Sequence, residues 1–159
     1  MAGTTTARGK SAGRFRRVRE DHARETAEDY TELVLELAES GQPVRPADLV
    51  RRLGVSHVTV LRALQRLIRA GVLERDAERG VLLSAEGRRI ARAARRRHQS
   101  VVAFLVKLGV PSAVAELDAE GIEHHVSETT VSLMADFVRR TGARERAKTA
   151  SPPRRRTRP

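Results

Sequence analysis

The sequence contains no cysteine among its 159 residues. Without thiols the chain forms neither disulfides nor thiolate metal sites, so any bound metal must be held by oxygen and nitrogen atoms. Long apolar runs are also absent: no stretch approaches the roughly 20 residues that a membrane-spanning helix needs. The first residues, MAGTTTARGKSAG, contain no apolar segment typical of a secretory signal. We therefore predict a cytoplasmic protein that contacts no membrane.

Acidic residues are scarce in three parts of the chain. Residues 1–19 hold six Lys or Arg and no acid, and residues 142–159 hold seven Lys or Arg and one acid. Residues 45–97 carry fourteen arginines and five acids, whereas residues 20–44 carry one arginine and eight acids. The net charge of +11 suggests a polyanionic partner, and its distribution points to the basic middle as the binding region.

Both termini are poor in large apolar residues, which predicts disordered basic tails at 1–15 and 143–159. Between them we expect a mainly α fold with a small β-hairpin wing. An N-terminal winged helix-turn-helix should occupy residues 16–84, and a C-terminal helical domain should occupy residues 85–142.

The helix-turn-helix is predicted by local signals. A first helix around EDYTELVLEL carries apolar residues at three- and four-residue spacings and ends at Gly41. A short helix then begins at Pro46 and stops at Gly54, and a second begins after Ser56, a good N-cap, and ends at Gly71. Two short helices joined by a Gly-containing turn are typical of this motif.

Two strand-like runs follow, Val72 to Glu74 and Val81 to Leu83, separated by a charged turn with Gly80. A hairpin after the second helix would be the wing. A long helix should run from about Ala85 to Gly109. Two further helices are expected, with Ser112 and Ser127 as their caps.

In a helix-turn-helix, residues near the start of the second helix contact base edges in the major groove. Here that set is Ser56, His57, Val58, Thr59 and Arg62. The hydroxyls suit bases or phosphates, the valine suits a thymine methyl, and the arginine suits guanine. The simpler alternative is that the arginines only solvate a surface. Coincidence of basic charge with the motif favours DNA binding, with phosphate contacts from Arg51, Arg52, Arg66 and Arg79.

The stretch EGIEHH suggests a metal site. Glu120, Glu123 and His124 stand at i, i+3 and i+4, which places them on one face of a helix. Without a cation the two glutamates repel each other, and Gly121 inside the helix costs about 1 kcal/mol. His125 points about 100° further round, so we do not include it as a ligand.

Three more residues offer matching donor atoms. Asp29 and Glu32 stand at i, i+3 on the first helix, and His98 lies where the long helix changes from basic to apolar. Taken alone, each has an ordinary explanation: paired acids on an exposed helix face are common, and a lone histidine on a helix usually packs or faces solvent.

Five segments occur in an order that resembles a known family. They are EDYTELVLEL, GVSHVTVLRALQRL, GVLERDAERGVLLSAEG, RRHQSVVAFLVKLGV and the stretch from Asp118 to Glu128, DAEGIEHHVSE. Together they are similar to the manganese-responsive members of the diphtheria-toxin-repressor family, over about residues 20–142. The sequence departs from the family at Val58, where a proline is common.

The resemblance implies a homodimeric repressor of manganese-uptake genes that binds double-stranded operator DNA. It also implies that residues 85–142 form a metal-binding and dimerisation domain with two Mn²⁺ ions per subunit. The ligands carried over by motif are Asp29, Glu32, His98, Glu120, Glu123 and His124.

Coordination chemistry agrees with this implication. Carboxylates suit hard ions such as Mn²⁺, and imidazole raises the affinity for transition metals. Four carboxylates and two imidazoles offer more donor atoms than one six-coordinate ion needs, so two ions fit better.

Other functions stay open from the sequence alone. The chain could respond to Fe, Zn or Co, since intrinsic affinity follows the Irving–Williams order. It could be a winged-helix regulator of a small organic ligand, with the acidic cluster as plain surface. A two-metal hydrolase is a third class, but the sequence has neither a phosphate-binding Gly-rich loop nor an evident nucleophile with a base. We therefore predict no enzymatic activity and no small-molecule substrate.

Overall fold

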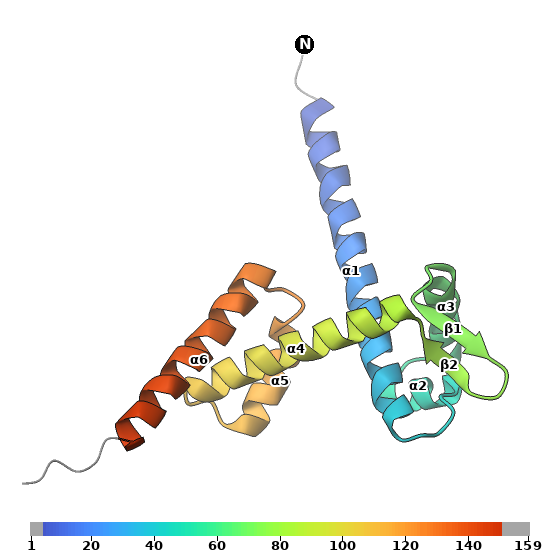
Figure 1. The fold of residues 1–159 in the computed structure, drawn as a ribbon. Helices are drawn as coiled ribbons and strands as arrows, with labels where there is room; N and C mark the ends of the chain where they lie inside the picture. Colours follow the sequence, from blue (N-terminus) through green and yellow to red (C-terminus); the bar gives the residue numbers. More distant parts are fainter. Residues whose placement is uncertain (1–4, 151–159) are drawn as a thin grey trace, which may run out of the picture. The chain divides into compact units, whose positions relative to one another are not determined.

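The computed structural model describes the backbone of residues 5–150 and the side chains of residues 20–143. The chain divides into two compact units, Met1–Arg95 and Arg96–Pro159. In chain order the elements are α1 (Thr5–Glu39), α2 (Pro46–Leu53), α3 (His57–Arg69), β1 (Leu73–Asp76), β2 (Gly80–Leu83), α4 (Ala85–Lys107), α5 (Ser112–Ile122) and α6 (Glu128–Ala150) (Figure 1). Among the described residues, no helix is both long and apolar enough to cross a bilayer.

Helix α1 contributes one apolar face to the core of the first unit. Tyr30, Leu33 and Val34 are buried, and Val34 is completely so. Their spacing of three and four residues puts them on one side of the helix, as the sequence predicts. The helix ends at Glu39, and Gly41 follows with a φ of 75°, a left-handed conformation that glycine adopts without strain.

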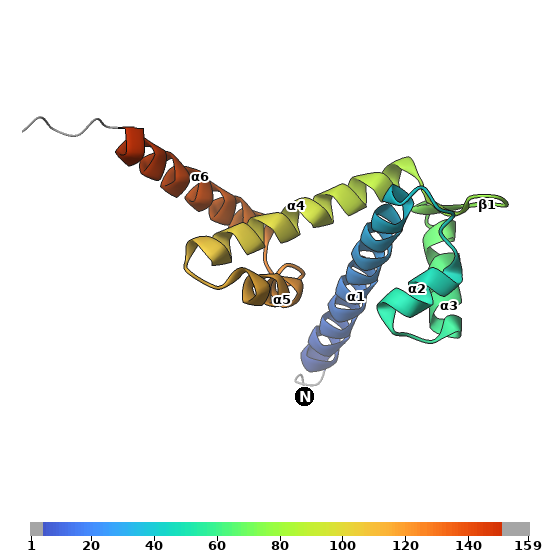
Figure 2. The same cartoon turned by 90° about the horizontal axis from the view of Figure 1, so that it is seen from below.

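Helices α2 and α3 form the predicted helix-turn-helix. Pro46 opens α2, and Gly54 closes it with a φ of 66°. The Ser56 hydroxyl accepts the backbone N–H of Thr59 at 3.1 Å and so caps α3. The two helices lie side by side (Figure 2), with the fully buried Leu49 and Val60 in the core that they share with α1.

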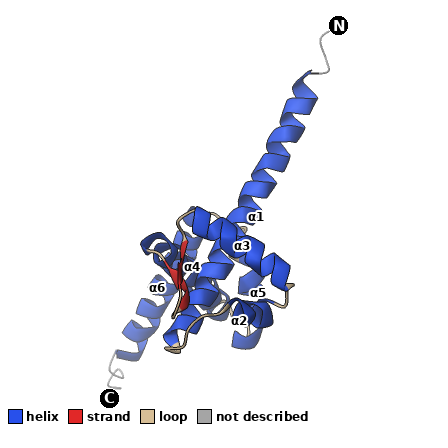
Figure 3. Cartoon of the chain, turned by 90° about the vertical axis from the view of Figure 1, so that its right-hand side faces the viewer, coloured by secondary structure: helices blue, strands red, loops and turns tan. Residues whose placement is uncertain are grey.

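The wing is the antiparallel pair of β1 and β2, drawn red in Figure 3, in which Leu73 lies opposite Leu83. Strand β1 begins one residue and ends two residues later than the predicted run, and β2 begins one residue earlier and ends at the predicted Leu83. The hairpin also pairs with the segment before α2: the backbone N–H of Val81 donates to the carbonyl of Val44 at 2.9 Å. A Cβ at Gly80 would collide with the same carbonyl, so the close approach requires glycine.

Helix α4 begins after Ser84, whose hydroxyl accepts the backbone N–H of Gly87 at 3.0 Å and donates to the carbonyl of Val72 at 2.9 Å. Its first part belongs to the first unit and its last part to the second.

In the second unit α4 packs on α6, where the rings of Phe104 and Phe137 meet edge to face with centroids 5.5 Å apart. The buried apolar side chains of this unit are small: Val101, Ala115, Ala119 and Val131.

One predicted helix cap differs from the structure: Ser112 is not a cap, because Pro111 occupies the N-cap position of α5 and makes no side-chain cap hydrogen bond. The two compact units meet after Arg95, inside α4, and the domain boundary expected at residue 85 stays a prediction. The helical backbone of α1 and α6 includes residues 5–15 and 143–150 of the predicted tails, while residues 1–4 and 151–159 lie outside the described part.

Candidate metal centre and nucleic-acid interface

His98, on the last part of α4, lies among three carboxylates of the second unit. Its Nδ1 is 2.7 Å from Oε2 of Glu123 and 3.8 Å from Oε1 of Glu120. Its Nε2 is 2.9 Å from Oε2 of Glu116. All three glutamates come from α5 or the turn after it. The imidazole is 19% exposed, so the ring is mostly enclosed.

Glu123 is the buried member of this group, with only 4% of its side chain exposed. Burial raises the pKa of Glu123, and the opposing effects of His98 and His124 do not cancel the rise. For His98, burial acts to lower the pKa, but the hydrogen bonds to Glu116 and Glu123 and the charges of Glu123 and Glu120 together raise it. A cation bound beside Glu123 would oppose the rise in its pKa, because positive charge favours the ionised carboxylate.

The position of Glu123 and His124 differs in one respect from the prediction. Helix α5 ends at Ile122, so the two residues lie in the turn that follows and not inside a helix. Glu123 still has helical dihedral angles, and its N–H donates to the carbonyl of Ala119 at 2.9 Å. Nε2 of His124 is 3.6 Å from Oε1 of Glu123. His125 is exposed.

The structure thus brings together four of the six predicted ligands: His98, Glu120, Glu123 and His124. Their donor atoms are carboxylate oxygens and imidazole nitrogens, a set that suits Mn²⁺ and other divalent transition ions. Within the part of the chain that the structure describes, no group of three or more such side chains is already arranged to hold a metal ion. In this arrangement Nδ1 of His98 and Oε2 of Glu123 are hydrogen-bonded to each other at 2.7 Å.

The other two predicted ligands, Asp29 and Glu32, lie on α1 in the first unit. Asp29 is exposed and Glu32 is half-buried. Between them in the sequence, Tyr30 and Thr31 are buried, and the Thr31 hydroxyl donates to the carbonyl of Ala27 at 2.7 Å. The buried pair fixes the rotation of α1 in its unit, which leaves the two acids on a different side of the helix from the core.

All nine residues predicted to contact DNA are exposed. They lie on α2, α3 and the turn of the hairpin: Arg51, Arg52, Ser56, His57, Val58, Thr59, Arg62, Arg66 and Arg79. Their roles differ in the structure. The hydroxyls of Ser56 and Thr59 are 2.8 Å apart and belong to the cap of α3, so they are engaged within the protein. The apolar side chain of Val58 takes no part in this cap, and 55% of the residue's surface is exposed.

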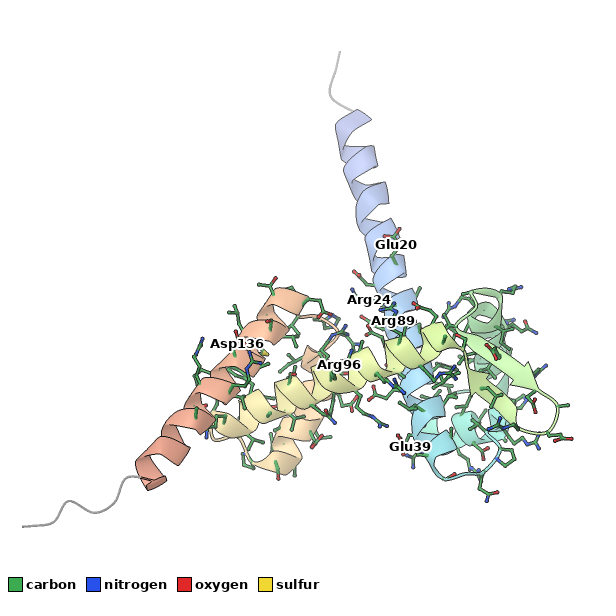
Figure 4. The ribbon with its side chains drawn as sticks, in the orientation of Figure 1. Glu20, Arg24, Glu39, Arg89, Arg96 and Asp136 are labelled. Atoms are coloured by element: carbon green, nitrogen blue, oxygen red, sulfur yellow. The ribbon has the colours of Figure 1, made fainter. Side chains whose placement is uncertain are left out.

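Several arginines of the basic middle form ion pairs. Arg51 pairs with Asp48, and Arg52 pairs with Glu36. On α4, Arg89 donates to Glu86 through Nε at 2.8 Å and Nη2 at 2.6 Å (Figure 4). Such exposed pairs contribute little to stability and exchange readily, so these arginines remain available to phosphates.

Glu116 was missed by the sequence prediction. It stands four residues before Glu120, so both lie on the same face of α5. That spacing was visible in the sequence, but nothing local indicates that the face turns toward His98, which is 18 positions away along the chain.

Comparison with known families and proteins gives consistent matches. Residues 22–81 match the family described as iron dependent repressor, N-terminal DNA binding domain. Residues 84–146 match iron dependent repressor, metal binding and dimerisation domain. Transcriptional regulator MntR of Escherichia coli O157:H7 is 46% identical over 130 residues, which cover 82% of this chain and 84% of that protein. HTH-type transcriptional regulator MntR of Bacillus subtilis (strain 168) is 32% identical over 70% of this chain and 78% of that protein.

Solved structures of the same kind are also similar. A manganese-dependent transcriptional repressor in complex with manganese has a TM-score of 0.64 and 31% identity, over 70% of this chain and 52% of that chain. The manganese regulator SloR has a TM-score of 0.64 and 25% identity, over 71% of this chain and 53% of that chain. This chain therefore matches about half the length of these structures.

Proposed function

This chain belongs to the iron-dependent repressor family, and on that premise we propose that it is a Mn²⁺-dependent DNA-binding repressor of genes for manganese uptake. In this proposal the protein regulates transcription by binding metal and DNA, without enzymatic activity. It acts in the cytoplasm. The observation that carries the proposal is the convergence of His98, Glu120, Glu123 and His124 inside residues 84–146, which match the metal-binding domain of the family.

Manganese is favoured over other metals by the donor atoms and by the relatives. The four clustered side chains offer oxygen and nitrogen only, and the chain has no cysteine to select a softer ion. Two of the similar proteins are described as a manganese-dependent repressor and a manganese regulator. We infer that Asp29 and Glu32 complete the ligand set from α1, which gives two ions per subunit. Their support is the spacing on the helix and the family resemblance.

A bound divalent cation supplies positive charge where carboxylates gather. The ligand atoms come from the chain: His98 and Glu123 offer mostly buried donor atoms, and Glu120, 70% exposed, offers its carboxylate from the solvent side. Without a metal ion, the His98 ring lies between Glu116 on one side and Glu120 and Glu123 on the other, and His124 lies beside Glu123. Metal binding should therefore favour one arrangement of these residues, and linkage then couples it to DNA affinity by about 1–3 kcal/mol.

Operator DNA is bound by the winged helix-turn-helix. Helix α3 enters the major groove, where His57, Val58 and Arg62 are the residues left for base edges once Ser56 and Thr59 cap the helix. The arginines of α2, α3 and the hairpin turn contact phosphates, so affinity should fall as salt rises.

The chain forms a homodimer through its second unit. Several large apolar residues of that unit are exposed: Val106, Leu108, Val114, Leu117 and Leu133. Leu117 is 76% exposed and Leu133 is 60% exposed, and the buried side chains of the same unit are small. A second copy that covers these residues would supply the apolar burial that this unit lacks.

The test is a footprint on DNA from the genomic neighbourhood of the protein's own gene, with Mn²⁺ and with a chelator. We expect Mn²⁺ to lower the protein concentration needed for half-protection by about 5- to 150-fold. The Glu123→Gln variant serves as the metal-blind control and should give the chelator result in both conditions. Equal protection of the same sites with Mn²⁺ and with chelator would rule the proposal out.

A further inference from the structure

Both ring nitrogens of His98 are engaged by carboxylates, but from opposite sides. Nδ1 faces Glu123 at 2.7 Å with Glu120 at 3.8 Å, and these two glutamates are proposed metal ligands. Nε2 faces Glu116 at 2.9 Å, and Glu116 is not among the proposed ligands. Nδ1 therefore faces two proposed metal ligands, whereas Nε2 faces a carboxylate outside the proposed ligand set.

A neutral imidazole carries one N–H and one lone pair, and a metal binds only to the nitrogen with the lone pair. In a metal site the other nitrogen commonly donates its N–H to a carboxylate, which fixes the tautomer and the orientation of the ring. For His98 the metal side is Nδ1, because Glu120 and Glu123 lie there. The N–H must then be on Nε2, and Glu116 is the carboxylate that accepts it.

We propose that Glu116 is the positioning residue of His98: it accepts the Nε2–H and so holds the Nδ1 lone pair toward Glu120 and Glu123. This inference rests on the proposed function, since it assigns the metal to the Nδ1 side. Glu116 itself contributes no ligand atom.

The placement of Glu116 on α5 suits this role. Ala115 and Ala119 are completely buried and form the packed face of α5. Glu116 and Glu120 each follow one of these alanines and so lie off the packed face. Glu116 is 59% exposed, so it reaches the ring from the solvent side. Replacement of Glu116 therefore removes no buried apolar side chain from the core.

The experiment is a calorimetric titration of the full chain with Mn²⁺ for the wild type, Glu116→Gln, Glu116→Ala and Asp118→Asn. Asp118 is an exposed carboxylate of the same helix, two residues along and so on a different face. It controls for the loss of one negative charge near the site. Glutamine keeps a carbonyl oxygen that accepts the Nε2–H, whereas alanine removes the acceptor.

We expect Glu116→Ala to weaken Mn²⁺ binding by about 10- to 100-fold with an unchanged number of ions per subunit. Glu116→Gln should fall between alanine and the wild type, and Asp118→Asn should bind as the wild type does. Equal losses in Gln and Ala would mean that the charge alone matters, and a loss of one bound ion would make Glu116 a ligand. Either result overturns the inference.

A second measurement reads the tautomer directly. Two-bond ¹H–¹⁵N correlation spectra of the ¹⁵N-histidine-labelled protein loaded with Zn²⁺, a diamagnetic ion, should show His98 with its proton on Nε2 in the wild type and a weaker, exchange-broadened Nε2–H signal in Glu116→Ala. A wild-type ring with its proton on Nδ1 would overturn the inference while the proposed function stands. A wild-type chain that binds no Mn²⁺ at all would overturn both.

Discussion

Oε2 of Glu123 lies 2.7 Å from Nδ1 of His98, although the two residues are 25 positions apart in the chain. The contact links the turn after α5 to the last part of α4 and excludes water from the glutamate, which is 4% exposed. Burial raises the pKa of this carboxyl, while His98 and His124 beside it oppose the rise. This arrangement is the basis of the first prediction.

Glu123→Gln should weaken Mn²⁺ binding by more than about tenfold, or 1.4 kcal/mol. The amide keeps the shape of the side chain and a hydrogen bond to His98, but it removes the negative charge that attracts the cation. Calorimetric titration with Mn²⁺ measures the effect, and thermal unfolding without metal should stay close to that of the wild type. Unchanged affinity would show that Glu123 only supports the fold.

Asp29→Asn tests the contribution of α1. We expect the dimer to persist and the effect of Mn²⁺ on DNA affinity to shrink from about 5- to 150-fold toward onefold. Light scattering gives the oligomeric state, and DNA titrations with and without Mn²⁺ give the coupling. Asp21→Asn, an exposed acid two helical turns earlier on α1, is the matched control. A full Mn²⁺ effect in Asp29→Asn would remove this residue from the ligand set.

Val58 offers a test of base readout. Its side chain is 55% exposed at the start of α3, and a thymine methyl in the major groove would cover it. Replacement of one thymine by uracil removes that methyl and should cost about 0.8 kcal/mol, or about fourfold in affinity, at a single operator position. In Val58→Ala the same replacement should cost less. If no thymine of the footprint shows this dependence on residue 58, Val58 does not read a methyl group.

Two glycines inside helices should respond to alanine in opposite ways. A Cβ at Gly87 on α4 would collide with the carbonyl of Val72, so Gly87→Ala should lower the free energy of unfolding by about 1–3 kcal/mol. A Cβ at Gly121 on α5 meets nothing within 4 Å, so Gly121→Ala should raise it by about 1 kcal/mol. Urea unfolding of both variants measures the pair. A destabilised Gly121→Ala would mean that the turn after α5 needs the freedom of glycine.

The helix-turn-helix could be predicted because its signals are local. Pro46, Gly54 and Ser56 each act within one turn of the backbone, and each takes the predicted place in the structure. Ser127 likewise caps α6 as expected and accepts the N–H of Thr130 at 3.2 Å. Ser112 failed because its predecessor is Pro111: the proline takes the N-cap position, and the serine becomes the first residue of the helix.

The candidate site was only partly predictable. The spacing of Glu120, Glu123 and His124 indicated a shared face, but the hydrogen bond between His98 and Glu116 depends on how α5 packs on α4. Nothing in the local sequence encodes that packing. The pairing of Val44 with the hairpin was missed for the same reason, since it joins segments more than 30 residues apart.

That pairing has a consequence for DNA recognition. The carbonyl of Val44 accepts the N–H of Val81 at 2.9 Å, and Nη2 of Arg45 donates to the carbonyl of Glu78 at 3.2 Å. The tip of the hairpin is thereby fastened to the start of α2 and cannot swing as an independent arm. We therefore expect the hairpin and α3 to contact a DNA duplex as one surface, so that little conformational entropy is lost on binding. A duplex whose groove geometry does not match that surface should bind less tightly.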